Sequence, residues 1–268
     1  SNPEFLREGS AVNDFMSPDR IVVGTGSGQA ARVMRDLYGP FGAAVVMTDI
    51  RSSEMIKYAC NSYLASRLSF INEIADICEK VDANIQSVID GMKYDRRIGG
   101  HYLSPGPGFG GPCLSKDIKS LISFGEKSGA NVNMLKAVLE RNEIQLDNII
   151  HRMNAALSGI SCKTVAVLGL SFKAGTNDTR NSPSLSLLGR LVNMNCSIRV
   201  YDPVVKVVDE FPESAVYYAD NPMDALNNAH CMIIMSEWDE FRQLDLETIY
   251  DIMKTPVIID TRNILSAG

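Results

Sequence analysis

A cysteine at the end of a glycine-rich stretch is the residue of this sequence best suited to covalent chemistry. The segment Gly106-Pro-Gly-Phe-Gly-Gly-Pro-Cys113 is followed by Leu-Ser-Lys116-Asp117. Glycines let a backbone approach a ligand closely, and a helix start with a nearby cation favours the nucleophilic thiolate. Asp117 lies one turn after Cys113, so we expect both side chains on one side of a helix. The pattern predicts covalent catalysis at Cys113, with a glycine-rich connector and a buried cysteine as the alternative.

Two pairs of polar residues have helical spacing. Lys57 and Asn61 are four residues apart on a segment whose other faces are apolar. A lysine at such a seam either extends its ammonium to solvent, which is the default, or serves catalysis. Glu4 and Glu8 are also four apart and could share a helical face, although a solvated first turn is their default interpretation.

Three cations follow apolar strands in the C-terminal part of the chain. Lys173 and Arg180 lie in the segment after the strand expected at 164–169, and Arg262 follows the strand expected at 256–260. Ligands of open parallel sheets bind beyond the carboxyl ends of the strands. Because Lys and Arg suit phosphate oxygens, this edge is predicted to bind an anion such as a diphosphate.

A glycine-containing turn at Gly24–Gly28 imitates a dinucleotide-binding fingerprint. It follows a strand, precedes a helix, and has Asp49 at the end of the next strand. The G-x-G-x-x-G spacing would place glycine at position 29, which is Gln29. We therefore favour an ordinary tight turn over a cofactor site there.

The elements that must position these residues fall into three regions. Region 1–50 has two short strands and one helix, too little to bury both faces of a sheet, and is predicted to belong to a larger sheet. Region 51–158 is helical, beginning with a long amphipathic helix from residue 53. Region 159–268 alternates strands with helices, which predicts a doubly wound parallel sheet. The fold class is α/β with a central helical domain.

Composition excludes several classes of protein. The hydrophobic share of 45% and charged share of 22% are those of a globular chain, and a net charge of −6 without a basic block argues against nucleic-acid partners. No apolar run is long enough to span a membrane. The six cysteines contain no C-x-x-C pair, and the three histidines lack metal-ligand spacing. We expect no metal, five cysteines that fill core space, and a reducing cytoplasmic location.

Four segments in one order carry a resemblance to a known family. They are Asn-Pro-Glu-Phe-Leu-Arg-Glu-Gly (2–9), Glu-Met-Ile-Lys-Tyr-Ala-Cys-Asn (54–61), Gly-Phe-Gly-Gly-Pro-Cys-Leu-Ser-Lys-Asp (108–117) and Gly-Leu-Ser-Phe-Lys-Ala-Gly-Thr-Asn-Asp-Thr-Arg (169–180). Together they resemble the UDP-glucose/GDP-mannose dehydrogenase family. The resemblance implies oxidation of the C6 alcohol of a nucleotide sugar to a carboxylate, with NAD as cofactor and a homodimer formed through the central helices. It also implies that region 1–50 is the remnant of an N-terminal Rossmann sheet. Most of the NAD-binding domain would then precede Ser1, so we expect this chain alone to be inactive.

The resemblance assigns catalytic roles by motif position. It implies that Cys113 traps the aldehyde as a thiohemiacetal, which is oxidised to a thioester and hydrolysed. Lys57 would stabilise the oxyanion, with Asn61 as its hydrogen-bonding companion. Asp117 would help to activate water, and Glu4 would be the base for hydrolysis.

Binding roles are implied in the same way. Arg97 would reach the substrate of the neighbouring subunit, and Glu8 would lie beside both sugar and cofactor. The implied substrate contacts are Phe5, Leu6, Glu8, Arg97, Tyr102, Gly110, Lys173 and Arg262. The implied NAD contacts are Glu8, Lys116 and Arg180.

The sequence also departs from the family pattern. Pro112 replaces the serine common before the cysteine and removes a backbone donor, and Ser115 replaces a proline. The Arg97-Ile-Gly segment and the loop 102–111 favour UDP-glucose as substrate. Oxidation of GDP-mannose or a UDP-N-acetylhexosamine, a non-catalytic nucleotide-sugar-binding module, and a small dinucleotide-binding protein using Gly24–Gly28 remain the alternatives.

Overall fold

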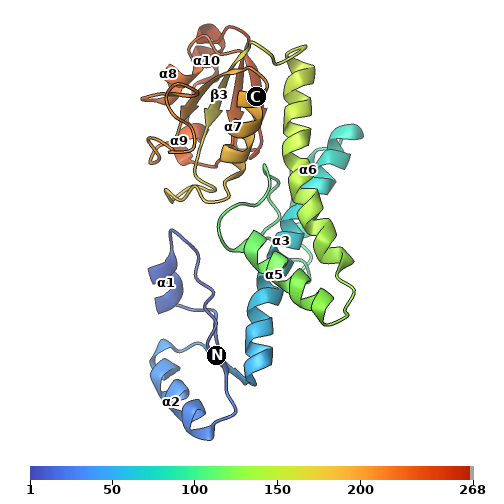
Figure 1. Ribbon diagram of the computed structural model, residues 1–268, viewed down its shortest axis with the longest axis vertical. Helices are drawn as coiled ribbons and strands as arrows, with labels where there is room; N and C mark the ends of the chain where they lie inside the picture. The colour runs from blue at the N-terminus through green and yellow to red at the C-terminus, as the bar shows by residue number, and fades with distance from the viewer. Residues whose placement is uncertain (266–268) are drawn as a thin grey trace.

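The chain folds into three parts that follow one another along its long axis. The computed structural model describes residues 1–265, so the last three residues of the expected region 159–268 lie outside the described residues. A small α/β unit lies at one end, long helices form the middle, and a second α/β unit lies at the other end (Figure 1). The predicted α/β class with parallel sheets and a helical centre is confirmed.

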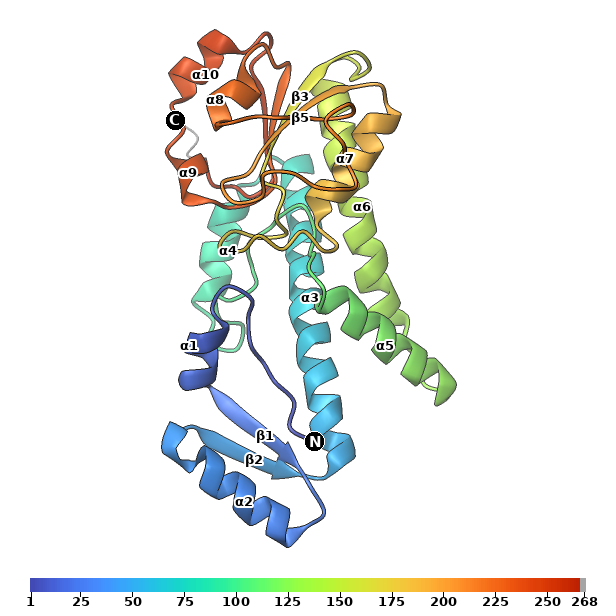
Figure 2. The ribbon, with the colours of Figure 1, turned by 60° about the vertical axis from the view of Figure 1, so that its left-hand side comes forward.

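The N-terminal unit is built on two parallel strands. β1 (Arg20–Gly24) pairs with β2 (Ala44–Thr48), and α2 (Gly28–Tyr38) with the 3-10 turn η1 (Gly39–Phe41) connects them. Residues 1–10, here called the N-terminal strap, precede α1 (Ala11–Met16). The strap begins beside β1, where Ser1 and Gly24 exchange two backbone hydrogen bonds, and extends toward the C-terminal sheet (Figure 2).

Four helices form the middle of the molecule. They are α3 (Ile50–Lys80), α4 (Ile85–Lys93), α5 (Leu114–Lys127) and α6 (Asn133–Ala156). The carboxylate of Asp49 accepts a hydrogen bond from the backbone N–H of Ser52 and so caps α3. At a rise of about 1.5 Å per residue, α3 is about 46 Å long, which lets it run from the N-terminal unit toward the C-terminal one.

The C-terminal unit is a parallel sheet with helices on both faces. Its strand order is β5-β4-β3-β6-β7. The strands are β3 (Thr164–Leu168), β4 (Ser197–Tyr201), β5 (Tyr217–Tyr218), β6 (Cys231–Ile234) and β7 (Val257–Asp260). The helices are α7 (Pro183–Asn193), α8 (Pro222–Leu226), α9 (Asp239–Arg242) and α10 (Leu246–Ile252).

Two hydrophobic clusters bury the two faces of this sheet. One contains the leucines of α7 together with Leu146, Ile149 and Met153 from the C-terminal half of α6. The other contains side chains from α8, α9 and α10. Because α6 also packs against α3 in the middle region, it is the rigid element that joins the helical part to the C-terminal sheet.

The structure corrects the sequence-based description in its details. α1, β5, α8, α9 and α10 were not predicted, because elements of two to seven residues are too short to show a hydrophobic period. The expectation that five cysteines fill core space is wrong for Cys162. That side chain is exposed at a turn with φ of 60°, outside the core.

Candidate active site

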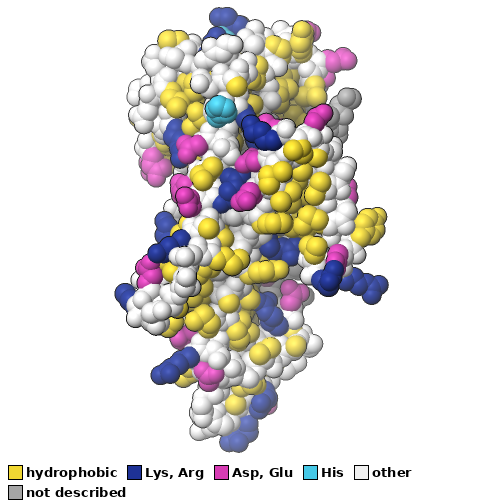
Figure 3. All heavy atoms as spheres, turned by 90° about the vertical axis from the view of Figure 1, so that its right-hand side faces the viewer, with side chains coloured by type: hydrophobic (Ala, Val, Ile, Leu, Met, Phe, Trp, Pro, Cys, Tyr) yellow, Lys and Arg dark blue, Asp and Glu magenta, His cyan; other side chains and the backbone are white. Residues whose placement is uncertain are grey.

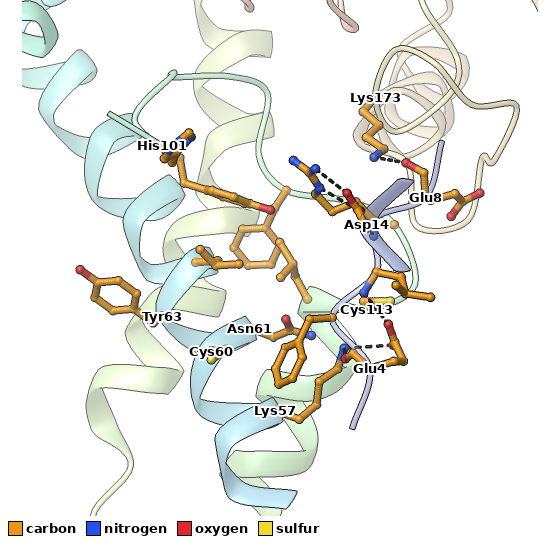
Figure 4. A pocket seen from close by; sticks show the side chains of 18 of the residues that line it. Glu4, Glu8, Asp14, Lys57, Cys60, Asn61, Tyr63, His101, Cys113 and Lys173 are labelled. Atoms are coloured by element: carbon orange, nitrogen blue, oxygen red, sulfur yellow. Dashed lines mark hydrogen bonds and ion pairs between the residues drawn. The ribbon is translucent and has the colours of Figure 1, made fainter. Parts of the chain in front are cut away.

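One large pocket lies where the strap, α3, the glycine-rich loop and the C-terminal sheet meet. Its volume is about 960 Å³, within the range of pockets that hold cofactors or drug-sized ligands. The pocket walls include most of the site residues predicted from the sequence. These are Glu4, Phe5, Leu6, Glu8, Lys57, Asn61, Tyr102, Gly110, Cys113, Lys173 and Arg262. Figure 4 shows Glu4, Lys57, Asn61 and Cys113 together at one end, with Glu8 and Lys173 at the other.

Lys57 is held by the strap rather than extended to bulk solvent. Its Nζ donates to the backbone oxygen of Glu4 at 2.6 Å and to Glu4 Oε1 at 3.0 Å. Burial alone would raise the pKa of Glu4, but hydrogen bonds from Leu6 N–H and Lys57 outweigh it and lower that pKa. Glu4 is therefore a carboxylate at neutral pH and forms an ion pair with Lys57. Among residues 1–265, Lys57 is the only lysine on a helix that lines the pocket.

Cys113 stands at the start of α5, as predicted. It is the residue before the first helical turn, its side chain is exposed, and its backbone oxygen accepts from Asp117 N at 2.9 Å. Asp117 is buried and absent from the pocket wall, whereas the Cys113 side chain is exposed. Asn61 Nδ2 donates to Asp117 Oδ2 at 2.6 Å, so Asp117 orients Asn61, which lines the pocket.

Two exposed cations flank the thiol. Lys116 Nζ lies 3.3 Å from Asp117 Oδ1, and Arg180 pairs with Asp178 at 2.5 Å and with Glu8 at 3.8 Å. The pKa of both cations is raised, chiefly by their carboxylate partners, and the negative charge of a Cys113 thiolate adds to the rise. Lys116 and Arg180 thus lie near Cys113, although neither lines the pocket described above.

The C-terminal sheet supplies the other wall. Lys173 Nζ donates to the backbone oxygen of Glu8 at 2.5 Å, and Thr176 donates to Glu8 Oε1 at 3.0 Å. Arg262 Nε lies 2.9 Å from the oxygen of Met235 and 3.2 Å from Glu237 Oε2. Burial lowers the pKa of Arg262, and the charge of Glu237 opposes that shift.

Arg97 is the predicted site residue that lies farthest outside this arrangement. Its side chain is 89% exposed and is held by Asp95 at 2.6 Å. The backbone oxygens of Ile98 and Gly99 accept hydrogen bonds from Arg67 on α3. The turn is therefore fixed, and Arg97 does not line the pocket of its own chain.

Several pocket residues were missed by reasoning from the sequence. Arg20 stacks on the ring of Phe5 at 3.9 Å, and Glu237 pairs with Arg262. Glu237 follows β6 at the same sheet edge as Arg262, so the strand-end rule could have found it. Phe172, which packs on Gly110 and lines the pocket, stood inside a segment already singled out for its cations. Arg20 begins a strand and carries no such signal.

The turn at Gly24–Gly28 is not shaped like a dinucleotide site. A Cβ on Gly24 would lie 2.1 Å from Ser53 Oγ, so this glycine is required for close packing of α3 against β1. Both carboxylate oxygens of Asp49 accept hydrogen bonds from Ser52, so Asp49 caps α3. The interpretation as an ordinary turn agrees with this geometry. Lys116 and Arg180, the two cations beside Cys113, are the residues here whose charge suits a cofactor diphosphate.

The described part of the chain contains neither a metal-binding cluster nor a membrane-spanning helix. Within residues 1–265, no group of three or more His, Cys, Asp and Glu side chains is arranged to hold a metal ion. The same residues contain no helix with the length and hydropathy needed to cross a bilayer. His230 Nδ1 accepts from Thr164 N at 3.0 Å, a structural role, whereas His101 lies exposed on the pocket wall.

Comparison with known proteins identifies the domains. Residues 1–42, 51–144 and 166–267 match the NAD binding, central and UDP binding domains of the UDP-glucose/GDP-mannose dehydrogenase family. A UDP-glucose 6-dehydrogenase of Rickettsia conorii is 42% identical over 99% of this chain and 62% of its own length. The chain thus spans about three fifths of the length of the curated relatives it matches.

Solved structures show the same likeness. A UDP-glucose dehydrogenase from Pyrobaculum islandicum superposes with a TM-score of 0.91 at 34% identity, over 98% of this chain and 60% of that one. A UDP-D-ManNAc dehydrogenase from Pyrococcus horikoshii superposes with a TM-score of 0.87 at 27% identity, over 100% and 61% of the two chains. In sequence, in domain order and in fold, the chain belongs to the UDP-glucose/GDP-mannose dehydrogenase family.

Proposed function

We propose that this chain is the substrate-binding and thiol-bearing part of an NAD-dependent UDP-glucose 6-dehydrogenase. The observation that carries the proposal is the convergence of Cys113, Lys57, Asn61 and Glu4 on one pocket whose far wall carries Lys173 and Arg262. A nucleophile with a cation beside it suits chemistry on a carbonyl carbon, and two cations farther along suit a diphosphate. The identity to named UDP-glucose 6-dehydrogenases supports this substrate over the alternatives.

The reaction oxidises a C6 alcohol to a carboxylate with loss of two hydrides. NAD, when bound, accepts one hydride in each oxidation. Cys113 Sγ adds to the aldehyde carbon, and loss of the second hydride leaves a thioester. Water then attacks the acyl carbon, the C–S bond breaks, and the carboxylate and the Cys113 thiolate leave with release of protons. One covalent site thus performs both oxidations without releasing the aldehyde.

The residues around Cys113 supply electrostatics and positioning. Lys57 stabilises the oxyanion of each tetrahedral species, a contribution often worth about 3 to 4 kcal/mol for one donor. Glu4 is proposed as the base for hydrolysis, since it lines the pocket and is ionised at neutral pH. Asp117 acts through Asn61, to which it is hydrogen-bonded, because it does not reach the pocket wall.

We propose that the two cations near the thiol contact the cofactor. Lys116 and Arg180 lie near Cys113, are largely exposed, and carry the charge that a diphosphate requires. Glu8 connects the two walls, because Lys173, Thr176 and Arg180 all contact it. It would therefore order the C-terminal wall beside both sugar and cofactor.

The first prediction concerns binding by this chain alone. UDP-glucose should bind in isothermal titration calorimetry, and GDP-mannose should bind more weakly. Lys173→Met should weaken UDP-glucose binding at least about tenfold, because it removes a charge-assisted contact. Lys206→Met is the matched control, since each lysine lies 5.6 Å from an aromatic ring and Lys206 lies outside the pocket. Equal loss in both variants, or no binding by the parent chain, would contradict the proposal.

We also propose that the chain dimerises through its central helices. Tyr63, Phe70 and Ile77 recur every seven residues on α3 and are 59%, 51% and 51% exposed. Figure 3 shows hydrophobic side chains gathered over the middle of one face of the molecule. An apolar stripe on a 31-residue helix suits pairing with a second copy. Arg97, exposed on a fixed turn, would then be free to reach the partner's substrate.

Dimerisation gives a second testable result. Phe70→Glu should convert a dimer into a monomer in sedimentation velocity experiments, because a buried unpaired carboxylate opposes association. Tyr250→Glu is the control, because Tyr250 is a similarly exposed aromatic on α10, in the C-terminal unit. A monomeric parent chain, or a dimer that survives Phe70→Glu, would refute pairing through this stripe.

A further inference from the structure

The loop that delivers Cys113 is held by side chains instead of by its own backbone. In the part of the chain that the structure describes, residues 101–112 form no hydrogen bond with another backbone group. A loop without such bonds would sample many conformations and would not fix the residue at its end. The partners of this loop therefore decide where the thiol stands.

Two buried amides hold the beginning of the loop. Asn72 Oδ1 on α3 accepts from Gly106 N at 2.8 Å, and Gln145 Nε2 on α6 donates to Gly106 O at 2.8 Å. Both side chains are at least nine-tenths buried. The two peptide groups that flank the Cα of Gly106 are thus fixed by two helices, while Arg262 lies against the same glycine from the C-terminal unit.

A third amide holds the middle of the loop. Asn142 Oδ1 accepts from Phe109 N at 2.7 Å, and Asn142 Nδ2 donates to Phe109 O at 3.1 Å. This side chain therefore pairs with both backbone groups of one residue, as a neighbouring strand would. Gly108, with φ of +103°, makes the approach possible, since a Cβ there would lie 2.9 Å from Asn142 Oδ1.

The two α6 contacts act from one rigid surface. Asn142 and Gln145 are three residues apart, so they lie on the same side of the helix. The following turns of α6 are anchored by Leu146, Ile149 and Met153 in the core of the C-terminal unit. The loop is therefore held in a fixed position against α6, the helix that also packs into the core of the C-terminal unit.

We propose that Asn142 and Gln145 are positioning residues for the reaction at Cys113. They fix the loop 106–113 through its backbone, with Asn72 as a third support, and so set the place of the thiol relative to Lys57 and the sugar. The inference rests on the proposed function in naming that reaction. The hydrogen-bonded frame itself can be tested without any activity.

The first test measures amide hydrogen exchange in this chain. Asn142→Ala should speed exchange of the Gly106, Phe109 and Gly111 amides at least tenfold, because the loop loses its support and opens as a unit. The matched control is Asn148→Ala, which removes a half-buried amide hydrogen-bonded to Asp76 from the same helix. It should leave these amides within about threefold of the parent. Equal effects of the two variants, or an effect confined to Phe109, would overturn the proposal.

The second test uses an isosteric acid. Ionised Asn142→Asp keeps the acceptor for Phe109 N–H but loses the donor to Phe109 O, whereas its protonated form restores both. The ratio of variant to parent exchange rates should therefore fall toward one as pH decreases through the carboxyl range. Asn142→Ala should show no such recovery. A pH-independent ratio for Asn142→Asp would contradict a specific pairing with Phe109.

The third test connects the frame to catalysis. In a protein that combines this chain with a complete NAD-binding domain, Asn142→Ala should lower kcat for UDP-glucose oxidation at least tenfold. Asn148→Ala should not, and the two variants should differ in this way even when their thermal stabilities are equal. Unaltered kcat with a loosened loop would refute the positioning role. Failure of the parent to oxidise UDP-glucose would refute the proposed function instead. The exchange experiments would then still test whether these amides hold the loop.

Discussion

Replacing Cys113 with alanine is expected to abolish uronate formation by a protein that combines this chain with a complete NAD-binding domain. The loss should be at least about a thousandfold, because Cys113 is proposed to hold the acyl carbon between the two steps. Cys60, the other thiol on the pocket wall, is half-buried and accepts a hydrogen bond from Arg20 at 3.4 Å, whereas Cys113 is exposed. UDP-glucose binding should persist, since Lys173 and Arg262, the cations proposed to contact the diphosphate, remain on the pocket wall. Uronate would be measured by mass spectrometry and NADH by absorbance.

Cys162→Ala is the control for this experiment. Cys162 is the other exposed thiol among residues 1–265, and it stands in the C-terminal unit outside the pocket. Its replacement should leave both oxidations intact. Uronate formation that survives in the Cys113→Ala protein would remove Cys113 from the role of nucleophile and leave the family membership untouched.

Replacing Lys57 with methionine is expected to lower kcat by about a hundredfold to a thousandfold. The ammonium of Lys57 contacts Glu4 of the strap, and methionine keeps the length of the side chain while removing its charge. KM for UDP-glucose should change much less than kcat, since Lys57 is proposed to bind charge that develops during the reaction. Steady-state kinetics at saturating NAD would separate the two parameters.

The loss at Lys57 can be distinguished from a change at Glu4. Lys57 helps to lower the pKa of Glu4, so its removal lets that pKa rise toward the ordinary 4.5. A carboxyl with that pKa is still ionised at pH 7, so protonation of Glu4 cannot explain a large loss there. Lys136→Met is the control, because Lys136 also forms an ion pair, with Glu126, but lies outside the pocket. An equal loss of kcat in the Lys57→Met and Lys136→Met variants would refute the oxyanion role of Lys57.

Local sequence patterns determined the elements and the types of chemistry. Asp49 and Ser182 precede α3 and α7 as caps, and the apolar runs of β3 and β6 became buried strands. These features depend on neighbours within a few residues, where spacing and residue type suffice. For the same reason the placement of Cys113 at the start of a helix could be read directly from its loop.

Only the tertiary structure decided which of these residues meet and how they are held. Glu4 reaches Lys57 across 53 residues, and Glu8 reaches Lys173 across 165. Such contacts leave no periodic mark in a sequence, because each depends on where two separate elements come to lie. Asp117 illustrates the point: its spacing predicts a place one turn after the thiol, but only the packing of α5 against α3 buries it and brings Asn61 into hydrogen-bonding distance. The amides that hold the Cys113 loop are ordinary helix residues until the fold brings Phe109 to Asn142.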